Sequence, residues 1–345
     1  MRATVLNGPG DVSLETVDDP TLPGADAVIV RITRTAICGS DLHLYHGIGG
    51  GPGVHLGHEF VGEVVEAGPD VRRFRVGDRV LVSGVIGCGA CDGCRAGDPV
   101  RCVTGPKVFG TNIELPGGQA EYAAVPAADM SLHLIPEAIT DEAAVLLTDI
   151  LPTGYFGARN AEVGPGDTVV VIGLGPVGVF ALQSAQLLGA ARVLAVDVVP
   201  ERLAHAARLG AIPVDASAGT HAQILELTGG LGADAVIEAV GADATVHDAL
   251  LCARAGGRVS VIGVNINMEF PFPMALAFFR DLTFRIGLCT IQTTWPELVP
   301  VVAAGRIRPE EIVTHRRGLS EVAEADRRFD AREDGVLKVM LDPTA

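Results

Sequence analysis

The amino-acid sequence predicts an α/β protein of two domains, one rich in β-strands and one built on a doubly wound parallel sheet. Its 345 residues are too many for a single compact core. Residues 1–35 carry short apolar runs broken by Gly-Pro and Pro-Gly turns, a pattern typical of β-structure. From residue 168 onward, apolar strand patterns alternate with helical patterns, and this alternation predicts a parallel sheet covered by helices.

The composition limits the classes of partner. Hydrophobic residues make up 48% of the chain and charged residues only 20%, so we expect large buried cores and no extensive disorder. The formal net charge of -16 would repel a nucleic-acid backbone or an anionic membrane. No apolar run is long enough to span a bilayer, and the residues after Met1 lack the core of a signal peptide. The sequence therefore predicts a cytoplasmic protein that binds neither nucleic acids nor membranes.

The first candidate site lies between Ala36 and Glu59. Cys38 and His58 are 20 positions apart, and each lies beside a glycine after a segment with a strand pattern. A catalytic zinc needs about three protein ligands and one open position. Cys38 and His58 supply two ligands, and Glu59 is a candidate for a transient contact or for a contact behind the ligands. The third ligand must come from further along the chain. The alternative interpretation is a buried cysteine and an ordinary loop histidine, because free cysteines are commonly buried.

A second cysteine cluster follows with the spacing C-x2-C-x2-C-x7-C. Four thiolates can close a tetrahedral zinc shell without an open position, which is typical of a structural site, and thiols at this density on a glycine-rich loop have no good packing explanation. A zinc-ribbon module for nucleic acids is the competing interpretation, but basic residues near the cluster are few and the whole chain is acidic. The predicted ligands of this structural zinc are Cys88, Cys91, Cys94 and Cys102.

A dinucleotide-binding pattern begins with the apolar strand segment at residues 168–172. The segment Gly173-Leu-Gly-Pro-Val-Gly178 follows and runs into a helical pattern, and an acidic residue, Asp197, ends the next strand. Strand, GxGxxG, helix and acid in this order predict a pyrophosphate site at a helix N-terminus. Asp197 can accept hydrogen bonds from both ribose hydroxyls and would repel a 2′-phosphate. The sequence therefore favours NAD over NADP.

The residues around His58 resemble a known family. From Gly57 the chain reads Gly-His-Glu, then Gly62, Gly68 and Val71, and Gly-Asp-Arg-Val follows at residues 77–80. This spacing is similar to the zinc signature of the medium-chain alcohol dehydrogenases. A β-hairpin with glycine turns would explain the glycines, but it does not require the adjacent histidine and glutamate.

The resemblance covers essentially the whole chain and implies a fold and a domain organisation. Residues 1–152 and 290–345 correspond to a GroES-like β-rich catalytic domain, with a structural zinc lobe at about residues 87–103. Residues 153–289 correspond to a Rossmann domain that binds NAD. The segment at residues 282–286 matches the strand through which family members pair, so the resemblance implies a homodimer or homotetramer.

The resemblance also implies roles for individual residues. Asp149 matches the third ligand of the catalytic zinc, although alone it could be a helix cap before Pro152, and Glu59 is implied as an alternate ligand. Ser40 matches the group that takes the substrate proton and passes it through the cofactor ribose to His43, which could also be an ordinary loop histidine. The implied cofactor contacts are Thr153, Gly173, Gly175, Pro176, Val177, Gly178, Asp197, Arg202, Val240, Gly263, Val264 and Lys338. Lys338 would reach the pyrophosphate, or it could be a plain charge on an edge strand.

The function implied is an NAD-dependent alcohol dehydrogenase with two zinc ions per chain, one catalytic and one structural. Its substrates would be small alcohols and the matching aldehydes or ketones. The segment from Thr148 to Tyr155 resembles formaldehyde dehydrogenases, which is the first alternative. A polyol dehydrogenase and a non-catalytic dinucleotide-binding protein are the others. The candidate pocket residues are apolar and favour unsubstituted alcohols over sugars; they are Phe109, Leu288, Cys289 and Trp295.

Overall fold

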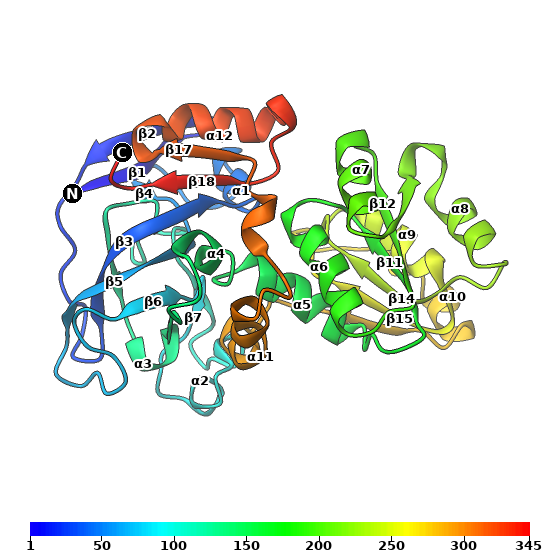
Figure 1. Ribbon diagram of the computed structural model, residues 1–345, viewed down its shortest axis with the longest axis horizontal. Coiled ribbons are helices and arrows are strands. Elements are labelled where there is room, and N and C mark those ends of the chain that lie inside the picture. Colours follow the sequence, from blue (N-terminus) through cyan, green and yellow to red (C-terminus); the bar gives the residue numbers. More distant parts are fainter. The chain divides into compact units, whose positions relative to one another are not determined.

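The structure, a computed structural model, describes residues 1–345. It divides into two compact units, each of which has its own sheets and core (Figure 1). The first unit is discontinuous and contains Met1–Pro152 and Thr290–Ala345, and the second contains Thr153–Cys289. The chain leaves the first unit within helix α5 (Ile150–Asn160).

The first unit is built around one long strand, β3 (Val28–Ile37). It belongs to a sheet with the order β10-β6-β5-β3-β18-β17, and β9 also pairs with β3. A smaller sheet has the order β2-β1-β4, and β7 pairs with β8. The other strands are β1 (Arg2–Gly8), β2 (Asp11–Thr16), β4 (Val54–His55), β5 (Glu59–Ala67), β6 (Arg79–Val82), β7 (Val85–Ile86), β8 (Lys107–Val108), β9 (Tyr122–Val125), β10 (Leu132–Leu134), β17 (His315–Gly318) and β18 (Val339–Asp342).

Helices of the first unit are short, apart from two near the C-terminus. Helix α11 carries Trp295, whose indole N–H donates to the carbonyl of Leu147 at 2.8 Å, and Gln292, whose amide donates to the carbonyl of Val85 at 2.7 Å. These bonds fix α11 to the segments before Asp149 and before the cysteine cluster. The helices are α1 (Asp41–Tyr45), α2 (Asp92–Arg95), α3 (Ala128–Ser131), α4 (Asp141–Val145), α11 (Ile291–Ala303) and α12 (Val322–Ala331).

The second unit is a parallel sheet of six strands in the order β13-β12-β11-β14-β15-β16. The chain runs outward from β11 to β13 and then returns to place β14 beside β11. This change of direction is the switch point at which dinucleotides bind in open α/β sheets. The strands are β11 (Thr168–Ile172), β12 (Arg192–Asp197), β13 (Ile212–Asp215), β14 (Ala233–Glu238), β15 (Ala253–Val261) and β16 (Thr283–Ile286).

The central strands of this sheet are apolar on both sides because each side meets a layer of helices. Val169 and Val171 of β11 pack with α5, α6 and α7, whereas Val170 and Ile172 pack with α8 and α9. These helices are α6 (Pro176–Leu187), α7 (Pro200–Arg208), α8 (Thr220–Leu227), α9 (Asp243–Cys252) and, near β16, α10 (Met274–Phe279). None of the helices is long and apolar enough to cross a bilayer. The predicted combination of a β-rich unit and a doubly wound parallel sheet is confirmed.

Candidate functional site

The pairing of β3 with β5 brings Cys38 and His58 together. Cys38 follows the last residue of β3, and His58 precedes the first residue of β5. The two strands are antiparallel, and Ala36 lies opposite Glu59. One strand therefore ends where the other begins, so residues 20 positions apart in the sequence meet at one end of the sheet.

Four side chains of different chemistry converge at this sheet end. One donor atom from each of Cys38, His58, Glu59 and Asp149 lies within 4.8 Å of the other three. Oδ2 of Asp149 is 3.7 Å from Sγ of Cys38 and 3.5 Å from Nε2 of His58. Asp149 comes from the turn after α4, where the carbonyl of Thr148 accepts the N–H of Gly84. A thiol, an imidazole and a carboxylate at this spacing fit a zinc ion.

Asp41, which the sequence analysis missed, orients two of the predicted ligands. Its Oδ1 lies 3.1 Å from Nδ1 of His58, and its Oδ2 accepts the backbone N–H of Cys38 at 3.0 Å. Asp41 is 3% exposed. A carboxylate at Nδ1 leaves Nε2 as the ring nitrogen that faces the other predicted ligands, which is the arrangement found behind metal-binding histidines. The only signal in the sequence was an acid three positions after Cys38.

The position of Lys338 contradicts both interpretations made from the sequence, a contact with the pyrophosphate and a plain charge on an edge strand. Its ammonium donates to Oε1 of Glu59 at 2.6 Å and to the carbonyl of Ile37 at 2.7 Å, and both charged side chains are fully buried. It therefore does not reach for a pyrophosphate. It is not an edge charge either, because β18, which begins at the next residue, lies between β3 and β17. Lys338 instead occupies one oxygen of Glu59, whose other oxygen has no hydrogen-bond partner.

Burial and the neighbouring charges shift the pKa values of two predicted ligands, Cys38 and His58. Burial raises the pKa of the Cys38 thiol, and the charge of Glu59 raises it further. Burial lowers the pKa of His58, but the charges of Asp41 and Cys38 outweigh this effect and hold it well above its ordinary value. The metal-free cluster therefore retains protons, and a metal ion that binds there must release them.

Ser40 contacts the same cluster, and His43 lies nearby on α1. The hydroxyl of Ser40 is 3.1 Å from Nε2 of His58 and 3.3 Å from Sγ of Cys38. His43 is partly exposed, and its place on the helix that starts at Asp41 puts it one turn from Ser40. The structure thus brings the predicted hydroxyl to the metal cluster, and it leaves the predicted histidine open to solvent.

The four-cysteine cluster occupies a separate lobe on α2 and the adjoining turns. The Sγ atoms of Cys88, Cys91, Cys94 and Cys102 all lie within 4.8 Å of one another. Gly87 and Gly93 admit this approach, since a Cβ at Gly87 would lie 2.5 Å from Sγ of Cys94, and one at Gly93 would lie 2.6 Å from the carbonyl of Arg101. Such a set of thiols fits a closed tetrahedral zinc shell.

Two thiols of this lobe have opposite acidity. Burial raises the pKa of Cys94 to about 12. The hydroxyl of Thr104, 3.2 Å from Sγ of Cys102, and the backbone N–H of Cys88 together lower the pKa of Cys102 to about 6. Cys102 is therefore the thiol that most readily becomes a thiolate in the metal-free lobe.

In the second unit, the glycine-rich loop joins β11 to α6. Gly173 has a φ of 90°, and a Cβ at Gly178 would lie 1.7 Å from the carbonyl oxygen of Gly173, so both positions require glycine. Gly175 is the N-cap of α6, and Pro176 and Val177 open the helix. The unpaired N–H groups at this helix start can hold a pyrophosphate.

Asp197 fixes the glycine-rich loop in place. Its Oδ2 accepts the N–H of Leu174 at 2.7 Å, and its Oδ1 accepts the N–H groups of Val198 and Val199. Nη1 of Arg202 is 3.6 Å from Oδ2. Three backbone N–H groups therefore already donate to the carboxylate. A carboxylate has about four lone-pair sites, so one ribose hydroxyl can still donate to it.

Three loops at the carboxyl ends of β11, β14 and β15 interlock through glycines. A Cβ at Gly173 would lie 2.4 Å from the side chain of Val240, and one at Gly263 would lie 2.1 Å from the backbone of Gly241. Val240 and Val264 are 50% and 49% exposed, which leaves apolar surface open for a cofactor. The fold thus gathers four predicted cofactor contacts from separate strands: Gly173, Val240, Gly263 and Val264. Thr153 lies in the first turns of α5.

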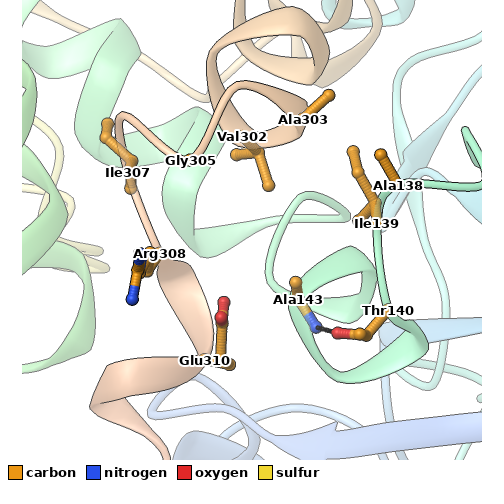
Figure 2. Close-up of a pocket in the computed structure, with 10 residues that line it drawn as sticks. All are labelled: Ala138, Ile139, Thr140, Ala143, Val302, Ala303, Gly305, Ile307, Arg308 and Glu310. Carbon is orange, nitrogen blue, oxygen red and sulfur yellow. Dashed lines mark hydrogen bonds between the residues drawn. The ribbon is translucent and has the colours of Figure 1, made fainter.

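The predicted pocket residues Phe109 and Trp295 belong to the core. Phe109 is 0% exposed and packs edge-to-face with Phe60, and Trp295 is 2% exposed. A hollow of about 170 Å³ between the start of α4 and the end of α11 contains none of the predicted site residues (Figure 2). Its polar groups include Thr140, whose hydroxyl accepts the N–H of Ala143 to cap α4.

Comparison with known proteins agrees with this geometry. Residues 24–137 match the family model of the alcohol dehydrogenase GroES-like domain, and residues 176–304 match that of the zinc-binding dehydrogenases. A probable zinc-binding alcohol dehydrogenase of Mycobacterium tuberculosis is 48% identical over 344 residues, which cover 99% of this chain and 89% of that protein.

Solved structures of related proteins have the same fold. The alcohol dehydrogenase TADH from Thermus sp. ATN1 has a TM-score of 0.94 and 41% identity, and 99% of each chain is covered. A putative zinc-binding dehydrogenase from Sinorhizobium meliloti, bound to NADP, has a TM-score of 0.86 and 30% identity, with 99% of each chain covered. The chain belongs to the zinc-dependent medium-chain alcohol dehydrogenases, a family of alcohol oxidoreductases that use a nicotinamide cofactor.

Proposed function

We propose that this protein is an NAD-dependent alcohol dehydrogenase that holds a catalytic zinc on Cys38, His58 and Asp149. The observation that carries the proposal is the convergence of these donors, together with Glu59, within 4.8 Å. Because Lys338 already occupies one oxygen of Glu59, three ligands remain for the metal and a fourth position stays open for substrate, as catalytic zinc sites require. Glu59 is the alternate ligand, through its unpartnered oxygen.

Zinc held by Cys38, His58 and Asp149 would supply polarisation of an alcohol oxygen, and a bound nicotinamide would supply the hydride acceptor. The residues of this chain supply the remaining functions. Asp41 holds the ring of His58 through Nδ1, and Lys338 balances the charge of Glu59. Ser40 is the group that takes the proton of the alcohol, and His43 is the group that releases it to solvent. Cys88, Cys91, Cys94 and Cys102 would hold a second zinc without an open position, and such a zinc would support the fold.

The proposal is tested by zinc analysis and by an activity panel. We expect two zinc ions per chain in the wild type and one in Asp149→Ala, with loss of NADH formation from alcohols and unchanged binding of NADH. Retention of both zinc ions in Asp149→Ala would contradict the ligand assignment.

A second variant tests the proton relay of Ser40 and His43. His43→Ala should slow turnover mainly below neutral pH, where an intact relay still accepts the proton. An unchanged pH profile would remove His43 from the relay.

The cofactor preference rests on Asp197. Its carboxylate lies at the end of β12, and the one cation beside it, Arg202, is already paired with it. This arrangement supports NAD, whereas the NADP bound by the Sinorhizobium meliloti protein keeps the alternative open to experiment. We expect a larger kcat/KM with NAD than with NADP. The opposite ratio would reassign Arg202 to a 2′-phosphate.

The substrate class is proposed as small alcohols with their aldehydes and ketones. A formaldehyde dehydrogenase is the second candidate, because the segment from Thr148 to Tyr155 around the predicted ligand resembles those enzymes. Assays with primary alcohols, secondary alcohols, polyols and formaldehyde separate these functions, and the absence of turnover with all of them would favour a non-catalytic binding protein. Cys38, Cys88, Cys91, Cys94, Cys102 and Cys252 are free thiols, which supports a cytoplasmic location.

We also propose that the chain forms a homodimer or homotetramer through β16. This strand ends its sheet, and large apolar side chains are exposed on and near it: Met268, Met274, Phe278, Phe279 and Ile286. An exposed strand edge beside apolar side chains is a template for pairing with another copy. Ile286→Lys should lower the mass measured by light scattering to that of the monomer, and an unchanged mass would exclude this edge.

A further inference from the structure

Gln119 lies behind the metal cluster, in contact with the carboxylate that orients it. The side chain is 0% exposed, and its Nε2 donates to Oδ2 of Asp41 at 3.2 Å. The same oxygen accepts the N–H of Cys38, and the other oxygen of Asp41 faces Nδ1 of His58. Gln119 is therefore hydrogen-bonded to Asp41, which in turn contacts two predicted zinc ligands.

The backbone of Gln119 is also joined to the segment that carries His58. Its N–H donates to the carbonyl of Leu56 at 3.0 Å, and its carbonyl accepts the N–H of Thr4 at 2.8 Å. Gly57 has a φ of 99°, and a Cβ there would lie 2.5 Å from Cγ of Gln119. The stem of Gln119 thus fills the space beside the residue that precedes His58.

The amide of Gln119 is only half satisfied. Its Oε1 is buried without a hydrogen-bond partner. An apolar side chain of similar shape would avoid burying this acceptor, so folding alone does not favour glutamine here. Positions that break such a local rule without a gain in stability are often functional.

We propose that Gln119 is a positioning residue for the catalytic metal cluster. Its amide fixes the carboxylate plane of Asp41, and Asp41 in turn holds His58 so that Nε2 faces the metal. Without this donor, Oδ2 of Asp41 keeps only the N–H of Cys38, and the carboxylate can turn about its soft terminal torsion. The inference rests on the proposed ligand set and adds a residue that touches neither zinc nor substrate.

The test is Gln119→Met in the full-length protein. Methionine keeps an unbranched stem against Gly57 but has no amide. We call the group of Cys38, His58, Glu59 and Asp149 the Cys38 cluster. Its zinc affinity, measured by chelator competition, should fall about tenfold. This value is the lower end of the loss in metal affinity expected when a residue that supports a metal ligand is removed. The cobalt absorption bands of that cluster should shift, and the melting temperature of the metal-free protein should stay the same or rise. The four-cysteine lobe, which Gln119 does not contact, is the internal control.

A matched control is Thr4→Val. Thr4 is also 0% exposed and has an unpartnered hydroxyl, and it bonds the backbone of Gln119 but not Asp41. This variant should keep the zinc affinity of the wild type. If Gln119→Met does not fold, Gln119→Leu provides the same measurement with a different stem.

The outcomes distinguish the possible roles. Wild-type affinity and cobalt spectra in the folded Gln119 variant would overturn the inference. A lower melting temperature with equal weakening of both metal sites would also overturn it, because that result indicates a purely structural residue. A wild-type protein that binds zinc only at the four-cysteine lobe would instead overturn the proposed function, and the inference with it.

Discussion

The two candidate metal clusters of the first unit are built in different ways. The four-cysteine cluster takes all its ligands from residues 88–102, on α2 and the adjoining turns. The Cys38 cluster collects ligands from the end of β3, the start of β5 and the turn after α4, and the residue before β18 supports it. One cluster depends on local spacing, and the other depends on how distant strands pair.

The surroundings of the two clusters differ as well. Cys88 of the lobe is exposed, and the thiols are partnered mainly by backbone groups and Thr104. The Cys38 cluster is packed among the buried charges of Asp41, Glu59 and Lys338. The four cysteines thus have few charged neighbours, whereas the buried carboxylates around Cys38 and His58 need paired charges to be stable.

Among the variants that test this difference between the clusters, Cys94→Ser should have the largest effect on the protein. Cys94 is a buried thiol of the lobe, and structural zinc contributes on the order of 10 kcal/mol of binding free energy in zinc-finger peptides. The variant should lose one zinc per chain and become sensitive to proteases at residues 87–103, as measured by elemental analysis and limited proteolysis. Cys252→Ser, which removes a buried thiol outside both clusters, is the control. Loss of both zinc ions from Cys94→Ser would show that the clusters are not independent.

The next effect concerns the buried ion pair. Lys338→Met leaves the carboxylate of Glu59 buried without its partner, which should lower the free energy of unfolding by about 3–5 kcal/mol. Urea unfolding of the metal-free protein measures the change. The double variant Lys338→Met with Glu59→Leu should recover most of the stability. If the double variant is as unstable as the single one, packing of the lysine stem is responsible instead.

A smaller, pH-dependent effect is expected at Asp326 of α12, which is 2% exposed and has one oxygen without a partner. Burial raises the pKa of Asp326 well above its ordinary value, and the charge of Asp41 adds to this. The folded state therefore holds this proton more tightly than the unfolded chain. Stability contributed by the group is fully present below pH about 3.9 and is lost as the pH rises to the raised pKa.

Asp326→Asn removes this titration. The variant should be more stable than the wild type at pH 7, because it has no carboxylate to bury, and the gain should shrink towards pH 4. Unfolding in urea across this range measures it. Asp330→Asn, on the same helix but paired with His46 at 2.9 Å, is the comparison variant. A gain that is equal at pH 4 and pH 7 would contradict the explanation.

The smallest effect concerns the acidity of a lobe thiol. Thr104→Val removes the hydroxyl that contributes most to the low pKa of Cys102. In the metal-free protein near pH 7, alkylation of Cys102 should slow by a few-fold, because the thiolate is the reactive form. Peptide mapping after iodoacetamide treatment follows the rate. An unchanged rate would show that the backbone N–H of Cys88 is sufficient.

Features that depend on short-range patterns were predicted from the sequence. The fold class followed from alternating strand and helix patterns, and the four cysteines converge as their spacing indicated. Cys38, His58 and Asp149 were named as ligands, the last only through family resemblance. Asp41 and Gln119 were missed, because each is recognised only by what it contacts. Phe109 and Trp295 were expected in a pocket, but apolar character alone does not distinguish a pocket wall from a core.

By itself, the sequence determined the four-cysteine lobe and the glycine-rich loop with its acid, because ligands and loops of this kind are set by neighbours along the chain. Only the tertiary structure decided that Lys338 meets Glu59, 279 positions away, and that Asp41 and Gln119 stand behind His58. Apolar periodicity specifies which face of a strand is buried, but it does not specify which residues of distant strands lie opposite each other. The pairing of β3 with β5 and β18 makes that choice, and the buried site is assembled at their shared end.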